Sequence, residues 1–239
     1  MSLYWLILFC TIAYFIGNIS PALAIARIRR IDIRKQGSGN TGTMNVLRTF
    51  GVKWGAICLF FDVLKGAIPA MVVFFLYGGN IHLHNNLNTI DSYIALYATG
   101  LAVIVGHCFP VFLKFKGGKG FASMIGVFTV AHPWVSIIAF VVLAVYIAIF
   151  EYGAMGSFIY ITFMVSYAAL QPFNEYNITV FILLFAFYFL MWYTHRTNIA
   201  RLILGKENSV TFLKSFHRKR LKKKQAKWLA SMNEIDKRV

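Results

Sequence analysis

Acidic residues, and charged residues of any kind, are scarce in this sequence. Asp and Glu number 8 against 24 Lys and Arg, and charged residues make up 13% of the 239 positions. A soluble domain usually carries about a quarter charged residues, and a chain of this length could not bury a composition that is 59% hydrophobic. The scarcity of charge excludes an ordinary soluble domain and indicates a polytopic membrane protein.

Cysteine is also rare, since the chain contains only Cys10, Cys58 and Cys108. Their odd number, uneven spacing and apolar surroundings argue against a disulfide framework and a zinc site, and we expect no metal site. We interpret all three as small core residues. Lys and Arg are absent from residues 1–10. The basic start of a cleavable signal peptide is therefore missing, and we expect the first hydrophobic helix to be retained.

Hydrophobic runs suited to crossing a bilayer recur along the chain, at about 20 residues a crossing. Lys and Arg number seven in 27–53, three in 114–120 and thirteen after 195. Because cations gather in cytoplasmic loops, the N-terminus is expected outside and the C-terminus in the cytoplasm. The pattern predicts an all-α polytopic integral membrane protein with about seven transmembrane helices, or five if two shorter late segments fail to cross. The predicted spans are 3–26, 54–78, 92–113, 121–131, 134–150, 154–170 and 178–194.

A basic tail follows the hydrophobic part of the chain. We divide the sequence into one membrane-embedded domain at 1–207 and a cytoplasmic tail at 208–239. Within the tail, 214–227 holds eight cations with aromatic and aliphatic residues between them. Such a run next to a membrane helix is expected to lie on anionic membrane lipid or to remain solvated. Nucleic-acid binding is not expected, although basic runs with aromatic residues can indicate it.

Three polar segments interrupt the hydrophobic pattern, and the first reads GSGNTGTMNVLRTFG at 37–51. Its glycines allow close approach of the backbone to a ligand, and its short polar side chains offer donors and acceptors. Successive N–H groups in such a loop can form an anion-binding concavity, and the planar fork of Arg48 suits phosphate or carboxylate. The composition alone fits an ordinary flexible loop equally well.

The second polar segment, KGGKG at 116–120, leads into the predicted helix at 121–131. Free N–H groups and the positive end of a helix dipole favour an anion at such a position. The spacing of a Walker A loop is not present. A basic anchor with a flexible turn remains an alternative, and we expect His107 and Pro110 to shape that turn.

The third polar segment, HRTNIARLILGKE at 195–207, lies at the cytoplasmic end of the last predicted span. His195 is a candidate for proton transfer because imidazole titrates near neutral pH, although a lone interfacial histidine is more often structural. Helical spacing places His195 and Asn198 on one face and Arg201 on another. We expect Glu207 to pair with an arginine.

Two charged residues lie inside a predicted span, at positions 62 and 65. Asp62 and Lys65 are three residues apart on a helix and can pair, which would neutralise both and support the preceding loop. The three polar segments all fall on the predicted cytoplasmic side. Together they are typical of one pocket for a polyanionic substrate at the bilayer surface.

On these three segments the sequence resembles the acyl-phosphate-dependent glycerol-3-phosphate acyltransferases, the PlsY family of bacterial phospholipid synthesis. The resemblance covers 1–207. It implies transfer of a fatty acyl group from acyl phosphate to the sn-1 hydroxyl of glycerol 3-phosphate at the cell membrane, which yields lysophosphatidate and phosphate. It implies no cofactor, no metal, and neither CoA nor a carrier protein as the direct acyl donor.

The resemblance also implies roles for individual residues. Ser38 and His195 are expected to be catalytic, by positioning or deprotonating the glycerol hydroxyl, and Glu207 is expected to be more structural. Thr41 and Thr43 depart from the family pattern, as does the residue after Thr43. The implied substrate-binding residues are Asn40, Asn45, Arg48, Gly117, Gly118, Lys119, Gly120 and Asn198.

Two other classes of protein compete with an enzyme. A transporter of an anionic metabolite usually binds its cargo near the midplane, between two related halves, whereas the only charges inside the predicted spans here are Asp62 and Lys65 and no halves are evident. A membrane scaffold would account for the basic tail but not for the glycine segments. Acyltransferases that use an H-x-x-x-x-D dyad are disfavoured, because none of the six histidines has an aspartate five positions later.

Overall fold

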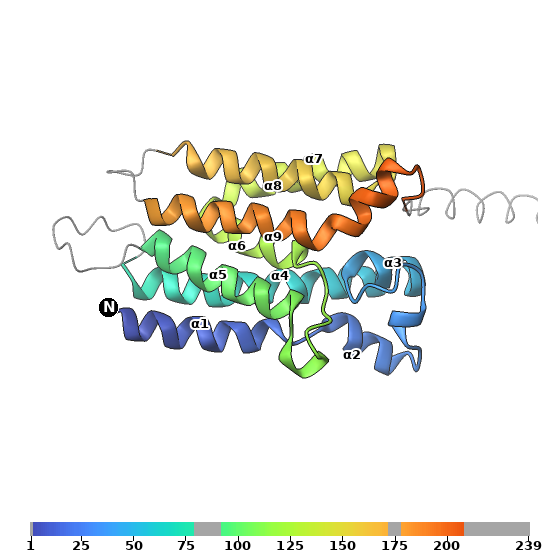
Figure 1. The fold of residues 1–239 in the computed structure, drawn as a ribbon, viewed down its shortest axis with the longest axis horizontal. Coiled ribbons are helices and arrows are strands. Elements are labelled where there is room, and N and C mark those ends of the chain that lie inside the picture. Colours follow the sequence, from blue (N-terminus) through green and yellow to red (C-terminus); the bar gives the residue numbers. More distant parts are fainter. Residues whose placement is uncertain (1, 79–91, 172–177, 208–239) are drawn as a thin grey trace, which may run out of the picture.

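The structure, a computed structural model, describes residues 2–78, 92–171 and 178–207. Within these ranges every regular element is a helix, and the long helices run side by side along one axis (Figure 1). The all-α fold that the hydrophobic pattern predicted is therefore confirmed. The basic tail at 208–239 lies outside the described residues, so its association with lipid stays a prediction.

Five helical segments in the described ranges are long and apolar enough to cross a membrane. They are α1 with α2 (Leu3–Gly17 and Pro21–Ile28), α4 (Val52–Leu76), α5 with the 3-10 helix η2 (Ser92–Cys108 and Val111–Leu113), α7 (Pro133–Phe150) and α9 (Ile178–Ile203). Two apolar helices are shorter, α6 (Phe121–Ala131) and α8 (Gly153–Ala169). The number of crossings depends on whether α6 and α8 span the membrane, so the predicted count of seven crossings stays a prediction.

The span predicted at 3–26 corresponds to the helical segment Leu3–Ile28, which is interrupted between α1 and α2. The break between α1 and α2 precedes Pro21, which has no N–H for an intrahelical hydrogen bond. Ser20 caps α2 by accepting a hydrogen bond of 3.3 Å from the backbone of its first turn. At the break, the Ile19 carbonyl accepts a hydrogen bond of 2.9 Å from Lys65 Nζ of α4.

The first and third polar segments are partly helical. The second half of the first glycine segment forms α3 (Thr43–Phe50), which places Arg48 on a helix rather than in a loop. The last span continues past 194 to Ile203, so His195 and Asn198 lie within α9. In both places polar side chains of the helix have partners in other segments, Asn45 at the Ser38 N–H and Asn198 at Lys119.

Glycine permits the closest contacts between helices. A Cβ atom added at Gly66 of α4 would lie 2.1 Å from the backbone oxygen of Ser123 in α6, and Gly126 of α6 makes a similar contact with the α4 backbone. Gly17 and Gly106 bring α1 and α5 together in the same way. Small residues at these positions let the backbones of membrane helices approach closely, which is a common basis for their packing.

The two ends of the helical bundle differ in character. The first residues of α1 lie at one end, whereas α2, α3 and the C-terminal end of α9 lie at the other, which we call the polar end (Figure 1). Between the ends, a core that includes the fully buried rings of Tyr97, Phe128, Tyr160 and Phe187 joins several helices. The core therefore holds the polar segments at one end of a packed bundle.

Candidate active site

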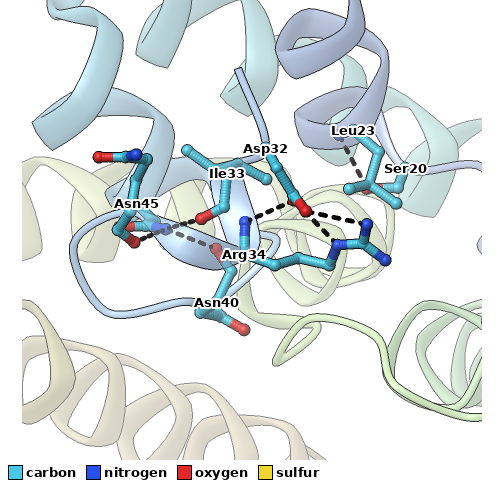
Figure 2. A network of polar contacts seen from close by, with 8 residues as sticks. Ser20, Leu23, Asp32, Ile33, Arg34, Asn40 and Asn45 are labelled. Atoms are coloured by element: carbon cyan, nitrogen blue, oxygen red, sulfur yellow. Dashed lines mark hydrogen bonds and ion pairs between the residues drawn. The ribbon is translucent and has the colours of Figure 1, made fainter.

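Asn45, on α3, organises the first glycine segment from inside (Figure 2). Its Nδ2 donates to the carbonyl oxygens of Ile33, Gln36 and Asn40 at 3.0 to 3.1 Å. Its Oδ1 accepts from the Ser38 N–H at 3.0 Å. Because Asn45 is only 1% exposed, its amide mainly serves to fold the loop, and its contact with substrate stays a prediction.

The glycines on both sides of Ser38 are required by the backbone. Gly37 and Gly39 have φ angles of +54° and +72°, in the region that favours glycine. A Cβ atom at Gly37 would also lie 2.3 Å from Asn45 Oδ1. Ser38 is half-buried, and within the described part of the chain its hydroxyl has no protein partner. The loop thus presents a serine hydroxyl that is available to a ligand.

The second glycine segment folds back onto the end of α5. The N–H groups of Gly117 and Gly118 donate to the carbonyl oxygens of Cys108 and His107, each at 3.1 Å. A Cβ atom at Gly118 would lie 2.1 Å from His107 Nε2, so the turn requires glycine there. These two N–H groups are engaged within the protein, and the binding of substrate by both glycines stays a prediction. His107 shapes the turn, as expected.

The second glycine segment leads directly into α6 through Lys119 and Gly120. Gly120 has a φ of +79° and is the N-cap of α6. Lys119, immediately before it, is anchored to α9, because its carbonyl oxygen accepts a hydrogen bond of 3.3 Å from the Thr194 hydroxyl. The turn therefore directs the Lys119 side chain toward α9, at the N-terminal end of a helix whose dipole favours anions.

His195 is held in one orientation on α9. Its Nδ1 lies 3.1 Å from the Met191 carbonyl oxygen, and its ring packs edge-on against Phe158, with centroids 5.4 Å apart. A carbonyl oxygen can only accept, so we assign the proton to Nδ1 and a free lone pair to Nε2. A neutral imidazole in this tautomer is suited to accept a proton at Nε2.

Asn198 connects the second and third polar segments. Its Oδ1 accepts a hydrogen bond from Lys119 Nζ and another, of 3.1 Å, from Arg201 Nη2. Its Nδ2 donates to Glu207 Oε1 at 2.7 Å, and Arg201 Nε lies 3.3 Å from Glu207 Oε2. The predicted pairing of Glu207 with an arginine is confirmed.

Arg201 is the residue of this cluster that the sequence analysis did not assign to the site. Helical spacing suggested that it faces away from Asn198, but the long guanidinium side chain reaches back one turn to it. The i,i+3 separation of the two residues was the signal that could have identified Arg201.

Arg48 of α3, in the first polar segment, lies within electrostatic range of Arg201 and Glu207. Burial lowers the pKa of Arg48, Glu207 opposes that decrease, and the positive charge of Arg201 adds to it. Burial likewise lowers the pKa of Lys119, to about 8, with contributions from Arg201 and Arg48 that Glu207 partly offsets. Three cations therefore lie within electrostatic range of one carboxylate, and their excess positive charge favours anionic ligands.

The predicted ion pair of Asp62 and Lys65 is present in α4. Lys65 Nζ lies 2.7 Å from Asp62 Oδ1, and both side chains are buried. Asp62 Oδ2 also accepts a hydrogen bond of 3.5 Å from the hydroxyl of Thr43, the first residue of α3. The pair thus contacts the start of the helix that carries Arg48. Among the described residues, no group of three His, Cys, Asp or Glu side chains could hold a metal ion.

Known proteins resemble the whole of this helical domain. The family model for glycerol-3-phosphate acyltransferase matches residues 7–205. The glycerol-3-phosphate acyltransferase of Aquifex aeolicus is 36% identical over 208 residues, which cover 87% of this chain and 99% of the relative. That of Thermoanaerobacter pseudethanolicus is 39% identical over 207 residues, which cover 85% of this chain and 95% of the relative.

Two crystal structures are similar in fold as well as in sequence. Both are of PlsY, an integral membrane glycerol 3-phosphate acyltransferase, and both are 33% identical to this chain. The glycerol 3-phosphate form has a TM-score of 0.76 and covers 88% of this chain and 98% of its own. The lysophosphatidic acid form has a TM-score of 0.71, with 85% and 94% covered. The chain therefore belongs to the glycerol-3-phosphate acyltransferase family.

Proposed function

We propose that this multi-pass membrane protein transfers a fatty acyl group from acyl phosphate to the sn-1 hydroxyl of glycerol 3-phosphate, releasing lysophosphatidate and phosphate. The observation that carries the proposal is the cationic cluster of Arg48, Lys119 and Arg201, which come from distant segments and share Glu207 as a counter-charge. The related PlsY structures, named as a glycerol 3-phosphate form and a lysophosphatidic acid form, support it, because these two molecules are a substrate and a product of the proposed reaction.

The cationic cluster suits a reaction between two anions. Acyl phosphate and glycerol 3-phosphate both carry phosphate groups, whose mutual repulsion Arg48 and Lys119 would offset. An acyl phosphate is a mixed anhydride with a good leaving group, so orienting the two substrates accounts for much of the required catalysis. Asn40 and Asn198 would add polar contacts, and positive charge would stabilise the departing phosphate.

The transfer itself needs an oriented hydroxyl and a proton acceptor. The glycerol oxygen forms a bond to the acyl carbon, and the bond between that carbon and the phosphate oxygen breaks. In our proposal Ser38 orients the glycerol hydroxyl, and Nε2 of His195 takes its proton and passes it to the departing phosphate. A phosphate group of a substrate is the alternative proton acceptor.

The proposal extends to the position of the enzyme in the cell. We place the acyltransferase domain at 1–207 in the bacterial cytoplasmic membrane, with the active site on the cytoplasmic side and the tail at 208–239 against anionic lipid. The distribution of Lys and Arg supports this orientation. Helix α3, which carries Arg48, and the C-terminal end of α9, which carries Asn198, lie at the polar end, opposite the start of α1 (Figure 1), which agrees with this orientation.

Purified protein supplied with palmitoyl phosphate and glycerol 3-phosphate tests the reaction directly. We expect lysophosphatidate and inorganic phosphate in equal amounts, and loss of both products in Ser38→Ala and Arg48→Ala, since each variant removes a substrate contact. A His195→Gln variant with normal turnover would assign the proton to a substrate phosphate instead. Phosphate release without lysophosphatidate would rule out the proposed transfer.

Transport is tested separately in sealed vesicles. A transporter would accumulate labelled glycerol 3-phosphate without acyl phosphate, whereas an acyltransferase would not. Uptake by a protein that yields no lysophosphatidate would favour the transporter, in which the cations line a pathway rather than an active site.

A further inference from the structure

The buried ion pair of Asp62 and Lys65 in α4 also contacts two other segments, at His107 and at Ile19. Lys65 Nζ lies 2.7 Å from Asp62 Oδ1 and 2.6 Å from His107 Nδ1, and it donates to the Ile19 carbonyl oxygen at 2.9 Å. His107 Nδ1 is 3.6 Å from Asp62 Oδ1. None of the three side chains is more than 8% exposed. We call Asp62, Lys65 and His107 the junction.

The hydrogen bonds of the junction determine the tautomer of His107. The Lys65 ammonium has only donors, so His107 Nδ1 must accept and the ring proton is on Nε2. His107 Nε2 faces the second glycine segment, because a Cβ atom at Gly118 would lie 2.1 Å from it. The imidazole thus has one nitrogen on the α4 ion pair and the other against the turn that precedes Lys119.

The junction contacts both segments that deliver cations to the site. On one side, Asp62 accepts the hydrogen bond from Thr43, at the start of the helix that carries Arg48. On the other side, the His107 carbonyl oxygen accepts the hydrogen bond from Gly118, the residue before Lys119. The segment that carries Arg48 is therefore bonded to a side chain of the junction. The residue before Lys119 is bonded to the backbone of His107 and lies against its ring.

Stability of the fold is a weak reason for such a group. Replacing a buried ion pair with apolar side chains of similar size is often neutral or stabilising, because the charges no longer have to be taken out of water. Positioning is a stronger reason, since a shift of about 1 Å in a group that orients substrate can cost about 100-fold in rate.

We propose that the junction fixes the spacing between Arg48 and Lys119, and that Asp62, Lys65 and His107 are positioning residues that do not touch substrate. This inference rests on the proposed function, because it assumes that the two cations bind the phosphate groups of the substrates. It adds His107 to the residues on which substrate binding depends, and it links the first and second glycine segments through the interior of the protein.

Two substitutions of His107 separate positioning from packing. In His107→Asn the side-chain oxygen can accept from Lys65 in place of Nδ1, whereas His107→Leu cannot accept. We expect His107→Leu to raise the KM for glycerol 3-phosphate by about tenfold or more and His107→Asn to recover it to within about threefold. Thr99→Val, which removes a buried hydroxyl from α5 away from the junction, should leave the KM unchanged.

The same experiment can overturn the inference. It fails if His107→Leu retains the wild-type KM, or if a folded His107→Asn is no better than His107→Leu. If His107→Leu does not fold, Asp62→Asn combined with Lys65→Met removes both charges together, and an unchanged KM in that folded variant is equally decisive. If the wild-type protein does not turn over palmitoyl phosphate, the proposed function fails by itself, and calorimetric titration with glycerol 3-phosphate tests the junction in the same variants.

Discussion

The amide of Asn198 holds three charged groups at once. Its oxygen accepts from Lys119 and Arg201, and its nitrogen donates to Glu207. A bound phosphate would compete with the amide oxygen for the same two cations. The Asn198 oxygen therefore holds both cations in place through contacts that can be exchanged for contacts with an anion.

The lowered pKa of Lys119 predicts how substrate binding depends on pH. With a pKa of about 8, the ammonium that attracts phosphate predominates at pH 7 and is lost as the pH rises through 8. We expect kcat/KM for glycerol 3-phosphate, which reports the free enzyme, to fall about tenfold between pH 7 and pH 9. Lys119→Arg stays charged over this range and should show a flat profile. A flat wild-type profile would contradict the prediction.

Residue types and spacing predicted two pairings correctly but not every side-chain direction. The pairing of Asp62 with Lys65 followed from i,i+3 spacing, and the pairing of Glu207 followed from nearby arginines. The scaffold role of Asn45 could not be predicted, since its three carbonyl partners meet only after the loop has folded. For Arg201, helical spacing gave the position of Cα but not the reach of a flexible side chain.

At the scale of helices, hydrophobic periodicity located the long elements and missed the features that depend on tertiary contacts. An isolated helix as short as α3 is marginal in water, and α3 forms here because its Asn45 and Thr43 side chains bond to neighbouring segments. The break between α1 and α2 could have been anticipated from Ser20 and Pro21. The hydrogen bond from Lys65 to the Ile19 carbonyl oxygen at this break could not have been anticipated, because it requires the packing of α4.

The glycine contact between α6 and α4 predicts a position-specific loss of stability. A Cβ atom at Gly126 would lie 2.1 Å from the backbone oxygen of Val63, which cannot move alone. We expect Gly126→Ala to destabilise the protein by about 1 to 3 kcal/mol, measured by thermal unfolding in detergent. Gly156→Ala in α8 is the matched control, because the added atom meets only side chains, of which the nearest is Leu143.

Those two alanine variants also separate packing from helix propensity. Both substitutions should favour the helical backbone by up to about 1 kcal/mol, so Gly156→Ala is expected to be neutral or slightly stabilising. Equal unfolding temperatures for the two variants would mean that α4 and α6 separate without cost, contrary to the close contact of their backbones.

At the scale of the whole molecule, the number of crossings determines which side of the membrane each late turn faces. If α6 and α8 both cross, Trp134 lies outside and Tyr152 lies in the cytoplasm. If neither crosses, the two positions exchange sides. The two residues are 78% and 39% exposed in the structure, so each can carry a label.

We expect seven crossings, and cysteine labelling in right-side-out spheroplasts tests this. In a protein whose native cysteines are replaced by alanine, Trp134→Cys should react with a membrane-impermeant maleimide, and Tyr152→Cys should react only after lysis. The reverse pattern would establish five crossings. Lys206→Cys, which is expected to react only after lysis under either count, controls for the integrity of the spheroplasts.

The shortness of α6 has a consequence for how the chain enters the membrane. Its 11 residues extend about 16 Å, roughly half of the hydrocarbon thickness of about 30 Å. A nascent segment of this length is poorly recognised by the insertion machinery on its own. Helix α4, whose Gly66 contacts the backbone of α6, would already be in the bilayer when α6 emerges. Insertion of α6 would then be completed by docking onto a helix made earlier, so that the second glycine segment reaches its place only after α4 has reached its own.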